Sequence, residues 1–314
     1  MSIPHTSAPF DSAALVVERL RQELGPEAVL IGEPMSRHTT FEIGGPADVV
    51  VAPFTSEQVV RALAVCRGVG APMLVVGRGS DLLVGDRGIR GVVVLLAENY
   101  AGIEVDGCRL RAQAGALLSE VARTAARQSL TGMEPLSGIP GSVGGACFMN
   151  AGAYGGETAA VLESVRVVND AGVVRELGVD ELAMGYRSSR IAKEGLVVLD
   201  AVFSLEPGDR GEIEAAMADF QARREEKQPL ELPSAGSTFK RPEGYFAGKL
   251  IMDSGLRGAR VGGAQVSEKH CGFVVNAGGA TAADVLGLIR HVQDTVEARF
   301  GVRLEPEVRL VGEF

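Results

Sequence analysis

Apolar residues recur at the three- and four-residue spacing of an amphipathic helix in five stretches of the chain. Thr55 and Thr281 stand directly before two of these stretches and are expected to be N-caps, the second with Asp284 at the capping-box position. Gly68 and Gly301 are expected to end the same two helices. We therefore expect helices over residues 12–24, 56–68, 116–128, 212–227 and 282–300.

Short apolar runs bounded by glycine and polar residues predict the strands, at residues 73–76, 92–96, 103–105, 108–113, 164–168 and 196–203. Because helices and strands do not alternate strictly, we expect an α+β fold rather than a doubly wound parallel sheet. The segment Gly132–Glu157 has neither periodicity and is expected to be a glycine-rich loop region.

A polar turn at Glu206–Gly211 interrupts the pattern and is the expected domain boundary. With 314 residues the chain exceeds what one small core usually holds, which favours two domains. The helix that follows the turn is expected to face Ile213, Met217 and Phe220 inward.

Composition is ordinary for a soluble globular protein, with 46% hydrophobic and 23% charged residues. No stretch approaches the ~20 apolar residues that span a bilayer, and the first 30 residues lack the apolar centre of a signal peptide. A net charge of −9 argues against a nucleic-acid partner. We therefore expect a cytoplasmic protein that binds neither membrane nor nucleic acid.

The four cysteines are scattered and form no C-x-x-C pair, so reduced thiols that pack as small hydrophobes are expected. The four histidines form no H-x-x-x-H pair, and no metal site is expected.

Glycine is abundant and clustered, with 41 residues in all, which indicates backbone that approaches a ligand closely. The first cluster, here called the first cradle, follows a strand and comprises Gly77, Arg78, Gly79, Ser80 and Asp81. Consecutive amides in such a turn can point at one anion. The third glycine of a Rossmann motif is missing, and a plain β-turn is an equally good interpretation of this motif alone.

The second cradle is the segment Gly138–Gly145, whose candidate ligand-binding residues are Gly138, Ile139, Pro140, Gly141, Ser142, Gly144 and Gly145. A flexible surface loop is the alternative interpretation. Flexible loops are rich in glycine, serine and other polar residues, whereas apolar residues alternate with the glycines of this segment. A phosphate or pyrophosphate is the expected guest, held most tightly here. Neither cradle ends in Gly-Lys-Ser/Thr, so a Walker-type triphosphatase is not expected.

Six blocks in order resemble those of the UDP-N-acetylenolpyruvoylglucosamine reductase family. Besides the two cradles they are Met149–Gly155, Gly185–Ser189, Ser234–Lys240 and Leu304–Arg309, and the segment Arg37–Gly45 also fits. The resemblance covers the chain from about Arg37 onward. Asp81 stands where the family more often has asparagine, and the short spacing from Arg187 to Ser237 resembles the class without an inserted substrate loop.

The resemblance implies an FAD-binding fold of the vanillyl-alcohol-oxidase type with an α+β C-terminal substrate domain. It implies non-covalent FAD, NADPH as hydride donor, and reduction of UDP-N-acetylglucosamine enolpyruvate to UDP-N-acetylmuramate in peptidoglycan precursor synthesis. A monomer is expected. The expected division is a FAD-binding region over residues 1–208 with a helical lead and two subdomains, a substrate domain over 209–303, and a tail over 304–314 that returns to the flavin.

The resemblance also assigns catalytic roles. Ser237 is expected to donate a proton, assisted by Lys240 or a water, and Arg187 to bind the substrate carboxylate through its planar fork. Glu307 is expected near the developing enolate, where a carboxylate makes sense only if it is protonated or locked to a cation. From the residues alone, Ser237 would be a turn residue and Glu307 a paired strand residue.

The substrate-binding positions that match the family are Tyr186, Lys227, Lys240, Arg241 and Arg257. Each cation among them could equally be a solvated surface residue. Two other functions are open: a flavin oxidase of the same fold, which has no evident need for Arg187, Ser237 and Glu307 together, and a non-enzymatic flavoprotein, which predicts loss of one of the three.

Overall fold

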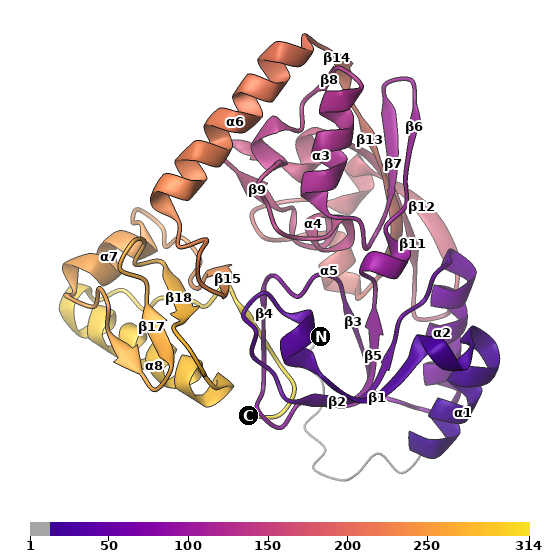
Figure 1. Ribbon diagram of the computed structural model, residues 1–314, viewed down its shortest axis with the longest axis horizontal. Helices are drawn as coiled ribbons and strands as arrows, with labels where there is room; N and C mark the ends of the chain where they lie inside the picture. Colours follow the sequence, from indigo (N-terminus) through magenta and orange to yellow (C-terminus); the bar gives the residue numbers. More distant parts are fainter. Residues whose placement is uncertain (1–12) are drawn as a thin grey trace.

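The computed structural model describes residues 13–314, and Figure 1 shows three groups of elements joined by one long helix. Ser12, where the first helix is predicted to begin, lies outside the described residues. The helices are α1 (Ala13–Leu24), α2 (Ser56–Gly68), α3 (Leu118–Arg127), α4 (Val143–Met149), α5 (Arg190–Glu194), α6 (Arg210–Lys227), α7 (Ala247–Asp253) and α8 (Ala282–Phe300).

The predicted end signals of α2 and α8 are confirmed. Thr55 accepts from the Gln58 amide at the start of α2, and Thr281 and Asp284 form a capping box at the start of α8. Gly301 ends α8 in the left-handed conformation, with φ +68°. The loop predicted over Gly132–Glu157 is wrong in part, because α4 lies within it. That helix has only seven residues, two of them glycine, so it carries no clear periodicity.

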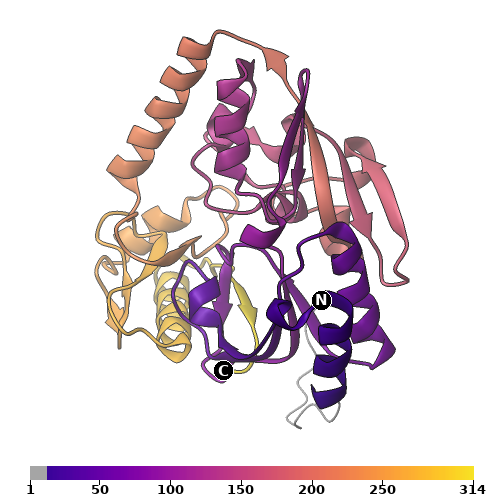
Figure 2. The same ribbon diagram turned by 45° about the vertical axis from the view of Figure 1, so that its right-hand side comes forward.

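The first sheet has the order β1 (Val29–Pro34), β2 (Pro46–Val51), β5 (Ile89–Leu95) and β3 (Met73–Val76). β2, β5 and β3 are parallel, and β1 is antiparallel to β2. Parallel strands that follow each other in the sequence need a crossover, and α2 provides it between β2 and β3, which flank β5. Figure 2 shows α1 and α2 together at one side of this sheet, where they contact each other and the strands.

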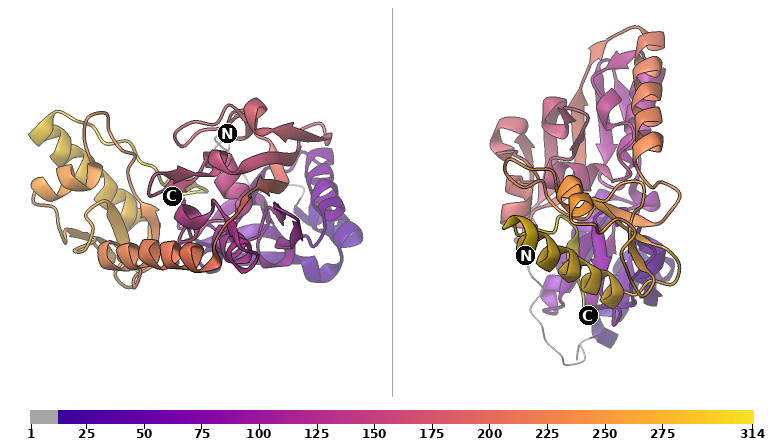
Figure 3. Two further views of the ribbon diagram at one scale, coloured as in Figure 1. Left: turned by 90° about the horizontal axis from the view of Figure 1, so that it is seen from above. Right: turned by 90° about the vertical axis from the view of Figure 1, so that its left-hand side faces the viewer.

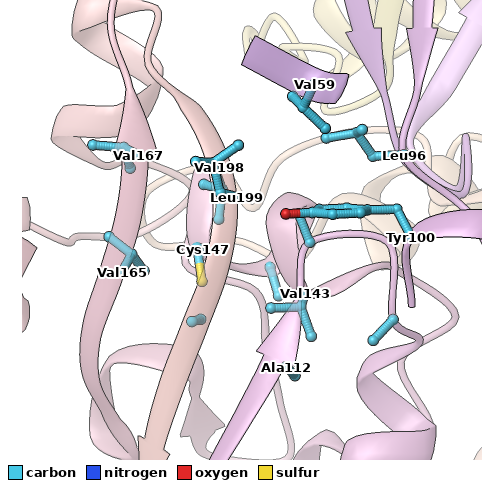
Figure 4. Packing of buried hydrophobic residues seen from close by; sticks show 14 of the residues in the cluster. Val59, Leu96, Tyr100, Ala112, Val143, Cys147, Val165, Val167, Val198 and Leu199 are labelled. Atoms are coloured by element: carbon cyan, nitrogen blue, oxygen red, sulfur yellow. The ribbon is translucent and has the colours of Figure 1, made fainter. Parts of the chain in front are cut away.

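The second sheet is antiparallel throughout. Its order is β12 (Val174–Gly178), β11 (Leu162–Val168), β13 (Val197–Ser204), β7 (Arg109–Gln113) and β6 (Ile103–Asp106). Side chains from both sheets form one core, and Figure 4 shows Tyr100 with Leu96 and Val143 in it. The Tyr100 hydroxyl is satisfied by Ser56 at 2.7 Å. The two expected subdomains therefore share a single hydrophobic core.

The third sheet has the order β15 (Ser234–Ser237), β18 (Phe273–Asn276), β17 (Ala264–Val266) and β16 (Arg260–Val261), and α8 packs on it. The chain then returns, and β19 (Arg309–Val311) pairs in parallel with β4 (Leu82–Val84), beside the first cradle (Figure 1). Two small ribbons complete the set: β8 (Leu130–Thr131) with β14 (Glu206–Pro207), and β9 (Gly152–Ala153) with β10 (Gly156–Glu157).

Helix α6 runs along the molecule from the second sheet to the third (Figures 1 and 3). The prediction that Ile213, Met217 and Phe220 face inward is supported, because Ile213 is buried, Met217 packs against the large core and Phe220 stacks on Tyr154 with ring centres 5.1 Å apart. The helix packs against α3 and β8 of the first region. The domain boundary predicted between residues 208 and 209 therefore stays a prediction. The contacts of α6 with α3 and β8 group this helix with the elements before that boundary, whereas the prediction put it in the substrate domain.

Within residues 13–314 no helix is long and apolar enough to cross a bilayer, and no three His, Cys, Asp or Glu side chains gather as metal ligands would. The four cysteines are free, and three of them are buried; Cys108 is exposed. Burial raises the pKa of the Cys66 thiol to about 11 and that of Cys147 to about 12. These two thiols are therefore unreactive packing residues.

Candidate active site

The first cradle carries the chain from β3 into β4 and leaves its amides free. None of the five amides of Gly77–Asp81 donates a hydrogen bond to another group in the described part of the chain. Gly79 has φ +60°, and a Cβ there would lie 2.1 Å from the His38 carbonyl oxygen, so no larger residue fits. This segment therefore offers a row of main-chain donors to a ligand.

The second cradle has fewer free donors. The amides of Val143 and Gly144 donate to the carbonyls of Ala116 and Ala114, both at 2.8 Å, and Ser142 Oγ accepts from the Gly145 amide at 3.3 Å. Ser142 thereby caps α4. The expectation that the second cradle grips an anion most tightly gains no support from these bonds, because the first cradle offers more unpaired amides.

The two cradles touch each other. A Cβ on Gly77 would lie 2.2 Å from Ser142 Oγ, and one on Gly141 would lie 3.4 Å from Ser80 Oγ. They therefore form one continuous wall. The guanidinium of Arg78 is bound elsewhere: its Nε donates to the Gly115 carbonyl at 3.2 Å, and it forms an ion pair with Glu98.

Ile139 and Pro140 shape the second cradle rather than donate to a ligand. The Ile139 amide bonds the Leu136 carbonyl at 3.1 Å, and its side chain packs against the large core. The carbonyl of Gly138 accepts a hydrogen bond from Arg224 of α6. Sequence reasoning missed Arg224, because no local motif marks a helix residue that supports a loop 86 positions away.

The structure pairs Arg187 with Glu307 and links Glu307 to the residue that follows Ser237. Arg187 Nε lies 2.7 Å from Glu307 Oε1, and the Glu307 side chain is only 10% exposed. The Glu307 amide donates to the carbonyl of Thr238, the residue after Ser237, at 2.8 Å. Arg187, Glu307 and the adjoining Ser237 are here called the catalytic cluster, after the roles that the family resemblance predicts for them.

Arg187 reaches Glu307 from a tight turn. The main chains of Gly185 and Ser188 bond each other in both directions, at 2.9 and 3.1 Å. Arg187 itself has φ +51°, a conformation that only a few residues other than glycine adopt. The turn therefore fixes the direction of the guanidinium.

Thr40 ties the first cradle to the strand that bears Ser237. Its amide donates to the Gly79 carbonyl at 3.3 Å, and its hydroxyl donates to the Ser234 carbonyl at 2.7 Å. The Ser234 amide returns a bond to the Thr40 carbonyl at 3.1 Å. Sequence analysis placed Thr40 in a family block but gave it no role, because its partners are not local.

Asp81 and Arg309 lie beside the catalytic cluster. The Arg309 amide donates to the Asp81 carbonyl oxygen at 3.0 Å, and the Arg309 guanidinium lies over the Phe148 ring at 4.7 Å. Burial and, to a lesser extent, the charge of Glu307 raise the pKa of Asp81 to about 7, against the opposing effect of Arg309 and Arg187. Sequence analysis assigned nothing to Arg309.

Tyr186 and Arg241 adjoin the cluster. The Tyr186 hydroxyl accepts from the Arg241 amide at 3.3 Å, and the Arg187 guanidinium lies 5.1 Å from the Tyr186 ring centre. The Arg241 guanidinium lies over Phe246 at 4.1 Å. Together they present aromatic rings and cations around the cluster.

The other three predicted cations make no hydrogen bond or ion pair with the cluster in residues 13–314. Lys240 pairs with Glu305. Lys227 is exposed at the end of α6, and Arg257 donates to the Glu268 carbonyl. Their part in substrate binding stays a prediction.

Two family models match the chain. Residues 47–178 match the FAD binding domain, and residues 228–311 match the C-terminal domain of UDP-N-acetylenolpyruvoylglucosamine reductase.

Curated relatives match almost the whole chain. The UDP-N-acetylenolpyruvoylglucosamine reductase of Agathobacter rectalis is 53% identical over 95% of this chain and 98% of its own length. That of Clostridioides difficile is 50% identical over 92% of this chain and 95% of its own.

Solved structures agree with these matches. The crystal structure of UDP-N-acetylenolpyruvylglucosamine reductase from Thermus caldophilus is 38% identical, with a TM-score of 0.78 over 90% of this chain and 98% of its own. A 4-ethylphenol oxidase from Gulosibacter chungangensis, 17% identical with a TM-score of 0.50 over 66% of this chain and 45% of its own, shares the fold of the first region. The expected fold class is confirmed.

Proposed function

The chain belongs to the UDP-N-acetylenolpyruvoylglucosamine reductase family, and from that membership we propose how its residues carry out the reaction. It is an FAD-dependent oxidoreductase that reduces UDP-N-acetylglucosamine enolpyruvate to UDP-N-acetylmuramate with NADPH as reductant. The reaction supplies a precursor of peptidoglycan.

The residues of the two cradles fit FAD. The first offers unpaired amides and the Ser80 hydroxyl, and the absence of a Cβ at Gly77 and Gly79 lets the turn pack closely against Ser142 and His38. We assign Gly77, Arg78, Gly79, Ser80 and Asp81 to cofactor binding, together with Gly138, Ile139, Pro140, Gly141, Ser142, Gly144 and Gly145. When bound, FAD supplies the two-electron chemistry that moves hydride from NADPH to the alkene.

Arg187 stabilises the charge that hydride addition creates. The addition leaves an enolate conjugated to the substrate carboxylate, and a fixed cation lowers the energy of that charge. Since Nε of Arg187 is held by Glu307, the two terminal nitrogens of the fork remain for the carboxylate. Glu307 thereby positions Arg187 near the enolate.

Ser237 delivers the proton to the second alkene carbon. It ends β15, where Gly236 has φ +73° and the neighbouring Thr238 bonds to the main chain of Glu307. A hydroxyl is a weak acid and needs an assistant. Lys240 is paired with Glu305, so we assign that help to a water.

Tyr186 and Lys240 are assigned to the substrate beside this cluster, and Lys227, Arg241 and Arg257 to the UDP portion. We further propose a monomeric, cytoplasmic enzyme with no nucleic-acid or membrane partner. The domain roles follow the expected division, with the tail 304–314 completing the flavin site. The observation that carries the assignment is the Arg187–Glu307 pair, joined through the main chain of Thr238 to Ser237.

The test is NADPH oxidation by the purified yellow protein with and without UDP-N-acetylglucosamine enolpyruvate. Ser237→Ala should keep FAD and its reduction by NADPH while losing product. Ser234→Ala is the matched control, because it lies on the same strand and its hydrogen bonds are main-chain ones. If NADPH were oxidised at the same rate with and without the enol ether, the assignment would be wrong.

A further inference from the structure

Asp81 is a half-buried carboxyl that forms no ion pair or side-chain hydrogen bond within the described residues. Other shielded acids differ from it in this respect. Asp200 binds Arg111 and Arg166, Asp48 binds Arg90, and Glu307 binds Arg187. An ionised Asp81 carboxylate would have no ion pair or hydrogen bond to offset the cost of removing its charge from water.

The charged groups that face Asp81 are Glu307, Arg309 and Arg187. Arg187 is already bound to Glu307 at 2.7 Å, and the Arg309 guanidinium lies over the Phe148 ring. Neither cation is therefore in place to neutralise Asp81 by direct contact.

The strand pairing keeps Asp81 close to Glu307. β4 and β19 are parallel, with Leu82 opposite Arg309, and the Arg309 amide bonds the main chain of Asp81. Two carboxyls in one site do not both ionise at low cost. Because Glu307 is bound to Arg187 at 2.7 Å and Asp81 has no such partner among the described residues, the proton belongs on Asp81. The pKa of Asp81, raised to about 7 chiefly by burial, agrees with this placement.

We propose that Asp81 acts as a neutral carboxylic acid and donates a hydrogen bond to the bound flavin. The inference rests on the proposed function, since FAD is the ligand of the cradle. The rest of the cradle presents unpaired donors, the amides of Gly77 to Ser80 and the Ser80 hydroxyl. A carboxylate at its end would repel the acceptors and phosphates of the flavin, whereas the protonated form adds one more donor. Asp81 is therefore a positioning residue that makes flavin binding depend on pH.

The test is the dissociation constant of FAD for the apoprotein, measured by flavin fluorescence from pH 5.5 to 9. If only the neutral form donates, affinity should be constant below about pH 7 and fall by up to about tenfold per pH unit above it. Asp81→Asn keeps the shape and a donor and does not titrate, so its affinity should be flat. A flat wild-type profile, or an unchanged fall in Asp81→Asn, would overturn the proposal.

Two further variants test the sign. Glu307→Gln removes the neighbouring negative charge and should move the fall to lower pH, whereas Arg309→Met removes a cation and should move it to higher pH. Shifts in the same direction, or none, would contradict the proposal even if Asp81→Asn failed to fold. Infrared spectroscopy of the apoprotein gives a second readout, since the neutral carboxyl band at pH 6 should disappear in Asp81→Asn.

These measurements need neither NADPH nor the enol ether. A protein that binds FAD with this pH dependence but does not turn over the substrate would overturn the proposed residue roles and leave the Asp81 inference standing. Normal turnover together with an FAD affinity that does not change with pH would overturn the Asp81 inference and leave the proposed residue roles standing.

Discussion

At the scale of single residues, the catalytic cluster depends on Arg187, because Glu307 would otherwise be a shielded charge without a partner. Arg187→Ala should lower kcat about 100- to 1,000-fold by removing a charge that faces the transition state. It should also lower the free energy of unfolding by about 1–3 kcal/mol, since an unpaired buried acceptor remains.

Arg190→Ala is the matched control for that change. Arg190 lies three residues away and forms an exposed pair with Glu194 at 2.7 Å, which contributes little to stability because water screens it. Turnover in Arg187→Ala equal to that of Arg190→Ala would rule out the assigned role.

Asp81 also predicts how stability changes with pH. Its pKa is about 7 in the folded protein against an ordinary value of 3.8, so the folded apoprotein holds this proton more tightly than the unfolded chain. Stability should therefore fall as pH rises from about 4 to about 7 and then level off. Asp81→Asn has no carboxyl to ionise and so does not lose stability in this way. Its free energy of unfolding in urea, relative to that of the wild type, should be unchanged at pH 4 and higher by at most about 4 kcal/mol above pH 7. An advantage independent of pH would contradict the raised pKa.

The resemblance identified Arg187, Ser237 and Glu307 from short motifs, and the structure places them in one cluster. Thr40 and Arg309 could not be found in that way. Their partners lie far along the chain, at Ser234 for Thr40 and at Asp81 for Arg309. Sequence motifs report local chemistry, whereas these contacts depend on which strands pair.

At the scale of elements, the first cradle depends on its glycines. Gly79→Ala combines a φ of +60° with a Cβ 2.1 Å from the His38 carbonyl oxygen. It should lower the free energy of unfolding by more than about 3 kcal/mol and abolish FAD binding, as strain and overlap add. Gly70→Ala is the control: its φ is +66° but no atom lies within 4 Å, so only the strain of about 1–2 kcal/mol remains. Equal losses in denaturant unfolding would show that the His38 contact is unimportant.

The start of α8 is held by a residue of the first region. Asp86, in the turn after β4, accepts from the amides of Ala282 and Ala283 at 2.7 and 2.9 Å. Asp86→Ala should cost about 1–2 kcal/mol of unfolding free energy, through lost capping and lost charge at a helix N-terminus. Asp209→Ala removes the cap of the exposed α6 instead and should cost about 1 kcal/mol or less. A greater loss in Asp209→Ala would contradict the role given to Asp86.

The elements predicted best were the long helices, because several apolar turns and a cap agree in each. Thr281, Asp284 and Gly301 fixed both ends of α8. Helix α4 was missed because seven residues give too little period to detect. The inward face of α6 was predictable from the helical spacing of its three apolar residues, but the pattern could not show that only Ile213 is fully buried.

At the scale of the whole molecule, the third group of elements shares its core with the first region. Phe41, Ile43 and Leu83 pack with the buried residues of α7 and α8. Residues 228–314 expressed alone should therefore lack a cooperative thermal transition, because they lose these three side chains and the β4 partner of β19. Circular dichroism melting checks this. A sharp transition in the isolated segment would show that its own core is sufficient.

The order of elements along the chain was largely predictable, but their assembly was not. Nothing in the apolar run around β4 indicates that its partner lies more than 200 residues later, at β19. The resemblance supplied that return, through the role it gave to Glu307. Periodicity sets the type of an element, whereas pairing depends on competition among all strands in the folded chain.

The return of β19 to β4 has a consequence for biosynthesis. Glu307 follows Arg187 by 120 positions, which at about 5–20 residues per second takes a ribosome about 6–24 s. During that interval the nascent chain holds both cradles and Arg187, while β4 has no partner strand and the carboxylate does not yet exist. A growing chain therefore cannot complete the catalytic cluster. The Arg187–Glu307 pair can form only after β19 has been made and can pair with β4, near the end of synthesis.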